Sequence, residues 1–278
     1  MKKALLLLVI LLSTNLVFSQ KKDKIKGSKI VTMEQKDVGE FDMLEVADEL
    51  EVFLVKGEKC GIEIEADDNL HEALGIDLSG TTLRLSLVRK ISSYKKFSIR
   101  VNYTDKFKLV TGRNDAKITA LSDIVLDNIT FKLSENCKFF GNVKSKVFTL
   151  EANDKSKSEL NIKTDKTLLK LSKYSVIKGL ISSSELNVDL YQKAEATLEG
   201  DAVDMKIRLD NDSKLTAKKL VAKNIDLTTE DSSECYVNCN TQITIDASGK
   251  SEIDLFGEQK IDMKRFADSA VLSKKPMK

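Results

Sequence analysis

Two consecutive segments of equal length decide the fold: residues 156–174, SKSELNIKTDKTLLKLSKY, and residues 175–193, SVIKGLISSSELNVDLYQK. Each segment begins with a small residue, and this spacing continues along the chain in both directions. Successive small residues stand 21, 19, 19, 19, 19, 20 and 18 positions apart: Ala116, Cys137, Ser156, Ser175, Ala194, Ser213, Ser233 and Ser251. Self-similarity at a fixed period is the sequence signature of a repeat architecture.

Apolar residues keep fixed places in each repeat. The residue six positions before each small one is always apolar: Val110, Phe131, Leu150, Leu169, Val188, Ile207, Leu227 and Ile245. Around it, apolar and polar residues alternate, which indicates strands with one face directed inward. Turn formers such as Asn153 and Asp154 stand between the alternating stretches. We therefore expect two short strands per repeat, one before the small residue and one beginning at it.

Repeats of this length favour a parallel β-solenoid. Units of about 19 residues are too short for helix pairs, and they lack the leucine-rich and WD signatures. Each coil can bury its apolar face only against the neighbouring coils. The predicted class is all-β: a parallel β-helix or solenoid with about eight coils of about 19 residues, preceded by an irregular β-strand N-terminal cap. At about 4.8 Å per coil, eight coils form a rod about 38 Å long.

The regions outside the repeats have recognisable roles. Lys2 and Lys3 precede an apolar stretch that is too short to span a bilayer, which predicts a signal peptide and a mature start near Gln20. The expected divisions are a signal peptide (1–19), a flexible lead-in (20–29), irregular N-terminal β coils forming a cap (30–105), regular repeats (106–257), and a C-terminal cap and tail (258–278). Residues 30–272 are expected to form one continuous domain.

Both ends of the solenoid need a cover, because a terminal coil otherwise exposes core and unpaired strand edges. In the N-terminal region six alternating segments predict strands, and residues 68–74, DNLHEAL, predict one helical turn. Near the other end, apolar residues resemble a degenerate ninth coil or cap: Ile261, Met263, Phe266, Ala270 and Leu272.

The charge balance and the cysteines limit the possible partners. The formal net charge is +2, so charge gives no reason to expect nucleic-acid binding. Cys137 and Cys235 lie five coils apart, about 24 Å along the rod, whereas a disulfide needs Cα atoms within about 7 Å. We expect buried free thiols, with a Cys235–Cys239 pair left open if the chain folds back after Val237. Those two cysteines lack the second ligand pair of a zinc site.

No catalytic constellation appears in the sequence. His71 is the only histidine, and we interpret it as a solvated loop residue. Pairs of acidic residues are frequent, but turns favour aspartate. The sequence therefore predicts no catalytic residue, no metal ligand and no cofactor.

Two charge patterns are candidate contact surfaces on the outside of the solenoid. The first, the charge ladder, alternates in sign from coil to coil and comprises Lys132, Glu151, Lys170, Asp189 and Arg208. The second, the lysine stack, comprises Lys117, Lys138 and Lys157. Opposite charges on neighbouring strands contribute about 0.2–1 kcal/mol per pair. Both patterns therefore fit a soluble face that specifies strand register, and also a face that binds a partner.

Several short motifs resemble one bacterial family. They are residues 41–46 (FDMLEV), 50–57 (LEVFLVKG), 62–70 (IEIEADDNL), 80–87 (GTTLRLSL) and 99–101 (IRV), the last leading to Gly112. The chain resembles, over about residues 40–250, the head GIN domain of putative auto-transporter adhesins. This resemblance implies an exported β-helical domain with an adhesion role assigned by analogy, as in Bacteroidetes-like bacteria. It transfers no catalytic residues.

The functional hypothesis is an exported, non-enzymatic β-helical protein that acts as an adhesin or as a surface-contact module of the cell envelope. Its place would be the periplasm, the outer surface or the medium, without a membrane span after signal cleavage. Its partner would be a surface glycan or a protein. The alternatives are a polysaccharide lyase or hydrolase built on a β-helix, and a periplasmic scaffold or binding protein. Short loops within the repeats leave little material for a catalytic cleft, and fold alone is weak evidence for function.

Overall fold

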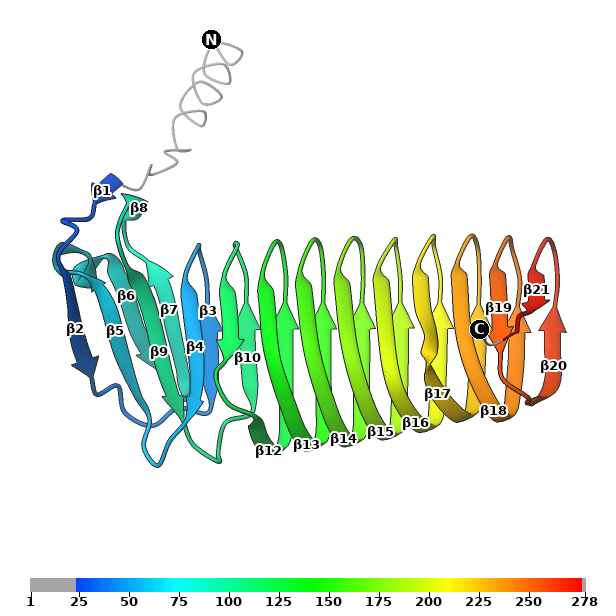
Figure 1. Ribbon diagram of the computed structural model, residues 1–278. Coiled ribbons are helices and arrows are strands. Elements are labelled where there is room, and N and C mark those ends of the chain that lie inside the picture. Colours follow the sequence, from blue (N-terminus) through cyan, green and yellow to red (C-terminus); the bar gives the residue numbers. More distant parts are fainter. Residues whose placement is uncertain (1–23, 277–278) are drawn as a thin grey trace, which may run out of the picture.

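The computed structural model describes residues 24–276, in which the coils follow one another along a rod (Figure 1). The predicted signal peptide and the start at Gln20 lie outside the described residues. Strands account for 68% and helix for 2% of the structure, with about nine turns of solenoid. The predicted β-solenoid class is confirmed, with about one coil more than expected.

From Lys138 to Ala247 each coil is one long strand of 14–16 residues rather than the two short strands expected, whereas the coils before and after keep shorter, separate strands. The strand leaves a tight turn, runs along one side of the rod, bends, and returns along the opposite side to the next tight turn (Figure 1). We call these two sides of stacked strands the walls. The strands of this region are β10 (Leu109–Gly112), β11 (Lys117–Ala120), β12 (Ile124–Leu133), β13 (Lys138–Ala152), β14 (Lys157–Leu171), β15 (Val176–Leu190), β16 (Glu195–Leu209), β17 (Lys214–Thr229) and β18 (Glu234–Ala247).

The bend does not interrupt the strands because small or short side chains face inward there. Neighbouring coils place them in register: Ser145, Thr164, Ser183, Ala202, Ala222 and Cys239. This second stack of small residues was not predicted. It leaves room for the two walls to meet, and the backbone pairing between coils skips a single residue at the bend before it resumes.

The apolar residues that stand six positions before the small residues form a continuous inner ladder, which equivalent residues of the flanking strands extend at both ends. Parallel pairing joins Leu83, Leu44, Val110, Phe131, Leu150, Leu169, Val188, Ile207, Leu227, Ile245 and Met263. All of them except Met263 are buried, and so are the eight predicted small residues. The predicted register is thus confirmed. The 20-residue interval after Ser213 has a local cause, a bulge in β17 at which the register with β16 shifts.

The N-terminal region forms the predicted irregular β-strand cap by combining parallel and antiparallel strands. β3 (Met43–Val46) and β4 (Glu51–Lys56) form a coil on β10 and β11, and β7 (Thr82–Leu87) and β9 (Phe97–Tyr103) add to it in parallel. Antiparallel strands then extend the two walls: β6 (Leu74–Ser79), β5 (Gly61–Asp67) and β2 (Val31–Lys36). The predicted helical turn is the 3-10 helix η1 (Asp68–Ala73).

The lead-in contains a paired strand, and the C-terminal end forms the ninth coil that was one of its two predicted alternatives. Within the lead-in, β1 (Lys24–Lys26) pairs with β8 (Lys90–Ser93). At the other end, β19 (Glu252–Phe256), β20 (Lys260–Phe266) and β21 (Val271–Lys274) continue the parallel stacking. Every residue of β20 is exposed. Residues 258–276 therefore add a coil, and no element among the described residues covers it as a cap.

Within residues 24–276, no helix is long and apolar enough to cross a membrane.

Candidate functional site

The structure places the charge ladder in one register line on the outer face. Lys132, Glu151, Lys170, Asp189 and Arg208 pair successively from β12 to β16. One direct ion pair forms within the ladder, between Lys132 Nζ and Glu151 Oε2 at 3.1 Å. Arg208 instead approaches Glu230 at 3.7 Å, and its guanidinium lies 5.9 Å from the ring centre of Tyr191. Most of the ladder therefore faces opposite charge within the protein.

A shallow groove of about 430 Å³ runs over the first part of the charge ladder. Its outer-face side chains include Thr111, Lys132, Glu151, Lys170 and Tyr191. Burial raises the pKa of Tyr191, with a further contribution from the Asp189 carboxylate, so this ring carries no charge at neutral pH. The groove combines one aromatic ring with charges that are largely paired.

The lysine stack has a different electrostatic character. Lys117, Lys138 and Lys157 follow one another in register on β11, β13 and β14. Lys117 reaches Glu51 at 2.7 Å. Lys138 and Lys157 are both exposed, and neither forms an ion pair with any residue that the structure describes. The two predicted surfaces are thus separate: one is internally balanced, and the other leaves cationic groups without a nearby partner.

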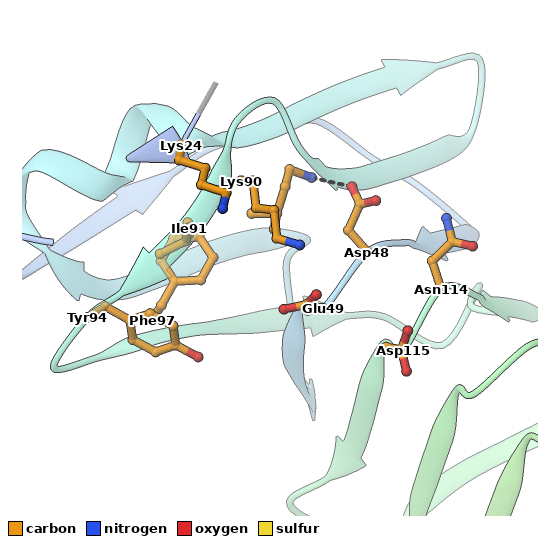
Figure 2. Close-up of a pocket in the computed structure, with 10 residues that line it drawn as sticks. Lys24, Asp48, Glu49, Lys90, Ile91, Tyr94, Phe97, Asn114 and Asp115 are labelled. Carbon is orange, nitrogen blue, oxygen red and sulfur yellow. Dashed lines mark hydrogen bonds between the residues drawn. The ribbon is translucent and has the colours of Figure 1, made fainter. Parts of the chain in front are cut away.

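A cleft at the N-terminal end was missed by sequence reasoning. We call it the end cleft; its volume is about 710 Å³. Figure 2 shows its lining, which comprises Lys24, Asp48, Glu49, Leu87, Lys90, Ile91, Tyr94, Phe97, Asn114 and Asp115. Two tight turns, the β7–β9 connection with the adjoining ends of those strands, and the first residue of β1 supply these residues. The sequence offered one signal, a long polar connection between two strongly alternating strands.

One buried carboxylate holds the β7–β9 connection in place. Asp67, at the end of β5, has no exposed surface and accepts hydrogen bonds from the backbone N–H groups of Lys29, Lys95 and Lys96 at 2.9–3.1 Å. Burial acts to raise the pKa of Asp67, but these hydrogen bonds outweigh it and lower the pKa below its ordinary value of 3.8. A charged Asp67 therefore fixes the chain beside Tyr94.

The opposite side of the end cleft consists of two tight turns. Asp48 and Asn114 adopt positive φ angles of 61° and 52°, a conformation that aspartate and asparagine tolerate well. Asp48 Oδ2 accepts a hydrogen bond of 2.8 Å from the Leu87 backbone N–H, which ties the first turn to β7 (Figure 2). The end cleft is therefore bounded by anchored backbone on both sides.

His71 and the cysteines form no reactive centre. His71 was expected to be solvated, but its side chain is 12% exposed and contacts Glu34 at 3.2 Å and Thr32 Oγ1 at 2.8 Å. All four cysteines are free; three are buried and Cys60 is half-buried. Burial raises the pKa of the Cys137 thiol to about 12. The Cys235–Cys239 pair left open by the sequence does not form.

The fold and outer face define an elongated parallel β-solenoid that presents ordered rows of side chains on closely spaced strands. Residues 40–258 match the family described as "Putative auto-transporter adhesin, head GIN domain", and the chain belongs to this family. The resemblance found in the short motifs is thereby confirmed. No curated protein matches the chain.

Solved structures share the fold at low sequence identity. A putative adhesin from Parabacteroides merdae is 18% identical with a TM-score of 0.66, covering 92% of this chain and 100% of that one. A putative adhesin from Parabacteroides distasonis is 15% identical with a TM-score of 0.63, covering 90% and 99%. A putative lipid binding protein, also from P. distasonis, is 12% identical with a TM-score of 0.55, covering 92% of this chain and 100% of that one. These similarities establish the fold.

Proposed function

We propose that this chain is an exported, non-enzymatic surface-contact module of the adhesin type, and that the lysine stack is its contact surface. The observation that carries the proposal is the in-register placement of Lys138 beside Lys157 without an ion-pair partner in the described chain. Family membership supports the adhesive role. The partner would be a surface glycan or a protein that presents negative charge.

Energetics favour a binding role over a structural one for the lysine stack. Like charges placed directly opposite each other on neighbouring strands destabilise a sheet. The charge ladder avoids this cost by alternating in sign, whereas Lys117, Lys138 and Lys157 do not alternate. An acidic partner would remove the repulsion on binding, and charges at the edge of such a contact mainly affect association rate and salt dependence.

Support for a non-enzymatic role comes from the shape of the coils. The connections between successive long strands are tight turns, from which no extended loops project over the walls. The grooves on the walls are shallow and lie over strands. Family membership points in the same direction, because the description names an adhesin and no reaction.

Binding by the exported chain, beginning at Gln20, tests the contact surface. The protein is screened by biolayer interferometry against sulfated and sialylated glycans, fibronectin, collagen and laminin. The double variant Lys138→Glu/Lys157→Glu should bind its partner roughly tenfold more weakly and with a smaller salt dependence. The matched control is Lys206→Glu/Lys223→Glu, which alters two exposed lysines of other coils and should leave binding unchanged. Equal losses in both double variants would contradict the assignment of the surface.

Export and the lack of turnover have their own tests. N-terminal sequencing of protein recovered outside the cytoplasm should begin at or near Gln20; a membrane-bound form that retains Met1 would contradict cleavage.

Incubation with common polysaccharides should release no products. Turnover that disappears on substitution of one specific carboxylate would replace the contact function with an enzymatic one.

A further inference from the structure

We propose that the end cleft binds a short segment of a neutral saccharide, with the ring of Tyr94 as its stacking platform. This site lies outside both surfaces predicted from the sequence and does not depend on the lysine stack. It goes beyond the proposed contact function by assigning a ligand class to a defined place at the closed end of the rod.

The aromatic platform is exposed and supported from beneath. Tyr94 is 49% exposed, whereas Phe97 is buried. Their ring centres are 6.1 Å apart with an interplanar angle of 63°, an edge-to-face contact. Tyrosine combines an apolar ring with a polar tip, which suits a ligand that is apolar on its faces and polar at its edges. The saccharide ring has this character, since C–H groups cover its faces and hydroxyl groups surround it.

The polar groups of the end cleft fall on two sides. In Figure 2, Lys24 and Lys90 lie with Tyr94, while Glu49, Asn114 and Asp115 lie across the cleft. Ammonium groups only donate hydrogen bonds and carboxylates only accept them, whereas a hydroxyl does both. A row of hydroxyl groups can therefore satisfy both sides at once.

The mixed charges of the end cleft favour neither a simple cation nor a simple anion. A cationic ligand would gain from Asp48, Glu49 and Asp115 but would meet Lys24 and Lys90. An anionic ligand would gain from Lys24 and Lys90 but would be repelled by the acidic residues across the cleft. Among the residues that the structure describes, Lys24, Lys90, Glu49 and Asp115 form no ion pair, so their hydrogen-bonding capacity is available. A neutral polyhydroxylated ligand uses both sides without net repulsion.

The end cleft is also held ready for binding. The buried Asp67 fixes the backbone at Lys95 and Lys96, next to Tyr94, and the Asp48 carboxylate ties one turn to β7. A site whose backbone is already ordered loses little conformational entropy when a ligand enters. The arrangement thus has the features of a small-ligand site: a concave shape, an aromatic surface and a few converging polar groups.

A single engineered fluorophore tests the inference directly, because the chain contains no tryptophan. Tyr94→Trp places the only indole in the end cleft and keeps an aromatic platform. The variant is titrated with cellotetraose, maltotetraose, xylotetraose and chitotetraose, and with trilysine and a sulfated heparin tetrasaccharide as charged probes. At least one neutral saccharide should change the emission saturably, while the charged probes should not. Saturable binding of the charged probes alone, or of no probe, would overturn the inference.

Variants of the unlabelled chain then locate the binding by isothermal titration calorimetry with the responding saccharide. Tyr94→Ala should weaken binding about tenfold or more, and Tyr94→Phe should largely retain it. The matched control is Tyr174→Ala, which removes a 57%-exposed ring on a turn of a regular coil and should have no effect. Unchanged affinity in Tyr94→Ala, with folding verified by circular dichroism, would place the saccharide elsewhere.

The lysine-stack variant separates this inference from the proposed function. Lys138→Glu/Lys157→Glu should bind the responding saccharide as the unmodified chain does. Saccharide binding that fails in this variant but survives Tyr94→Ala would assign the ligand to the outer wall and overturn the end-cleft site.

Discussion

The two ends of the inner ladder hold the same register position in very different surroundings. Leu83 ends the ladder on β7 and has no exposed surface, while Met263 ends it on β20 and is 41% exposed. Both are apolar, and both pair in parallel with a buried neighbour, Leu44 and Ile245 respectively. Register alone therefore directs a side chain inward without burying it. Burial needs one more layer of structure beyond the last rung.

At the N-terminal end that layer consists of elements that leave the repeat. β6 pairs antiparallel with β7, and β5 pairs antiparallel with β9. η1 connects β5 to β6 and contributes the buried Leu70. The change from parallel to antiparallel pairing thus ends the stack of coils at this side.

At the C-terminal end the exposed edge carries features that oppose uncontrolled pairing. The register between β18 and β20 shifts after Ile245, so that Lys264 is an extra residue in the edge strand. Lys260 and Lys274 add positive charge on the two last strands. Bulges and edge lysines discourage association through open strand edges. Covering elements therefore end the stack at the N-terminus, whereas a bulge and positive charge protect the exposed edge at the C-terminus.

The largest effect is expected midway between the two ends, where coils lie on both sides of each rung. Ile207→Asp would bury an unpaired charge and should destabilise the chain by more than about 3 kcal/mol in urea unfolding; Val188→Asp should do the same. The outward neighbours are the controls. Arg208→Asp and Asp189→Lys stay in contact with water and should each cost about 1 kcal/mol or less. Equal losses at Ile207 and Arg208 would contradict the inward and outward assignment.

The next largest effect is expected at the covered end. Leu83→Ala removes a fully buried side chain and should cost about 2–5 kcal/mol, the range for large-to-small changes in a core. Urea unfolding measures it. A cost below about 1 kcal/mol would show that β6 and η1 do not seal this end in solution.

A smaller, pH-dependent effect is expected where Asp67 fixes the β7–β9 connection. The folded state lowers the pKa of Asp67 below 3.8, so its contribution is present at neutral pH and is lost as the pH falls through the folded pKa. Asp67→Asn should lower the thermal midpoint at pH 7, and by less than Leu83→Ala does. The difference from the unmodified chain should shrink below pH 3.8. A difference that is constant from neutral to acidic pH would contradict a role for the charge.

The smallest effect is expected at the open end. Met263→Ala should cost about 1 kcal/mol or less, because much of this side chain is already in water. The matched substitution one rung inward, Ile245→Ala, should cost about 2–5 kcal/mol. A large loss in Met263→Ala would indicate that another body covers this end in solution, and its dependence on protein concentration would show whether a second copy does so.

The sequence by itself determined the features that depend on period. The spacing of the small residues defined the coils, and alternation placed Ile207 inward and Arg208 outward, as the structure confirms. It also placed Lys138 beside Lys157, because residues one period apart become neighbours in a parallel stack. These relations are local or repeat at a fixed interval, so one chain carries enough information to predict them.

Only the tertiary structure decided the features that depend on how the two walls meet, on what covers an end, and on contacts between segments outside the repeat. The period places Thr164 beside Ser183, but alternation within a coil does not show that the strand continues through the bend where the two walls meet. The apolar residues near the C-terminus, Met263 among them, left a ninth coil and a cap both open in the sequence, because burial depends on what lies beyond them. The end cleft gathers Glu49, Tyr94 and Asp115 from segments that share no period. Their proximity follows from the antiparallel closure and from the hydrogen bonds of Asp67, which no spacing along the chain records.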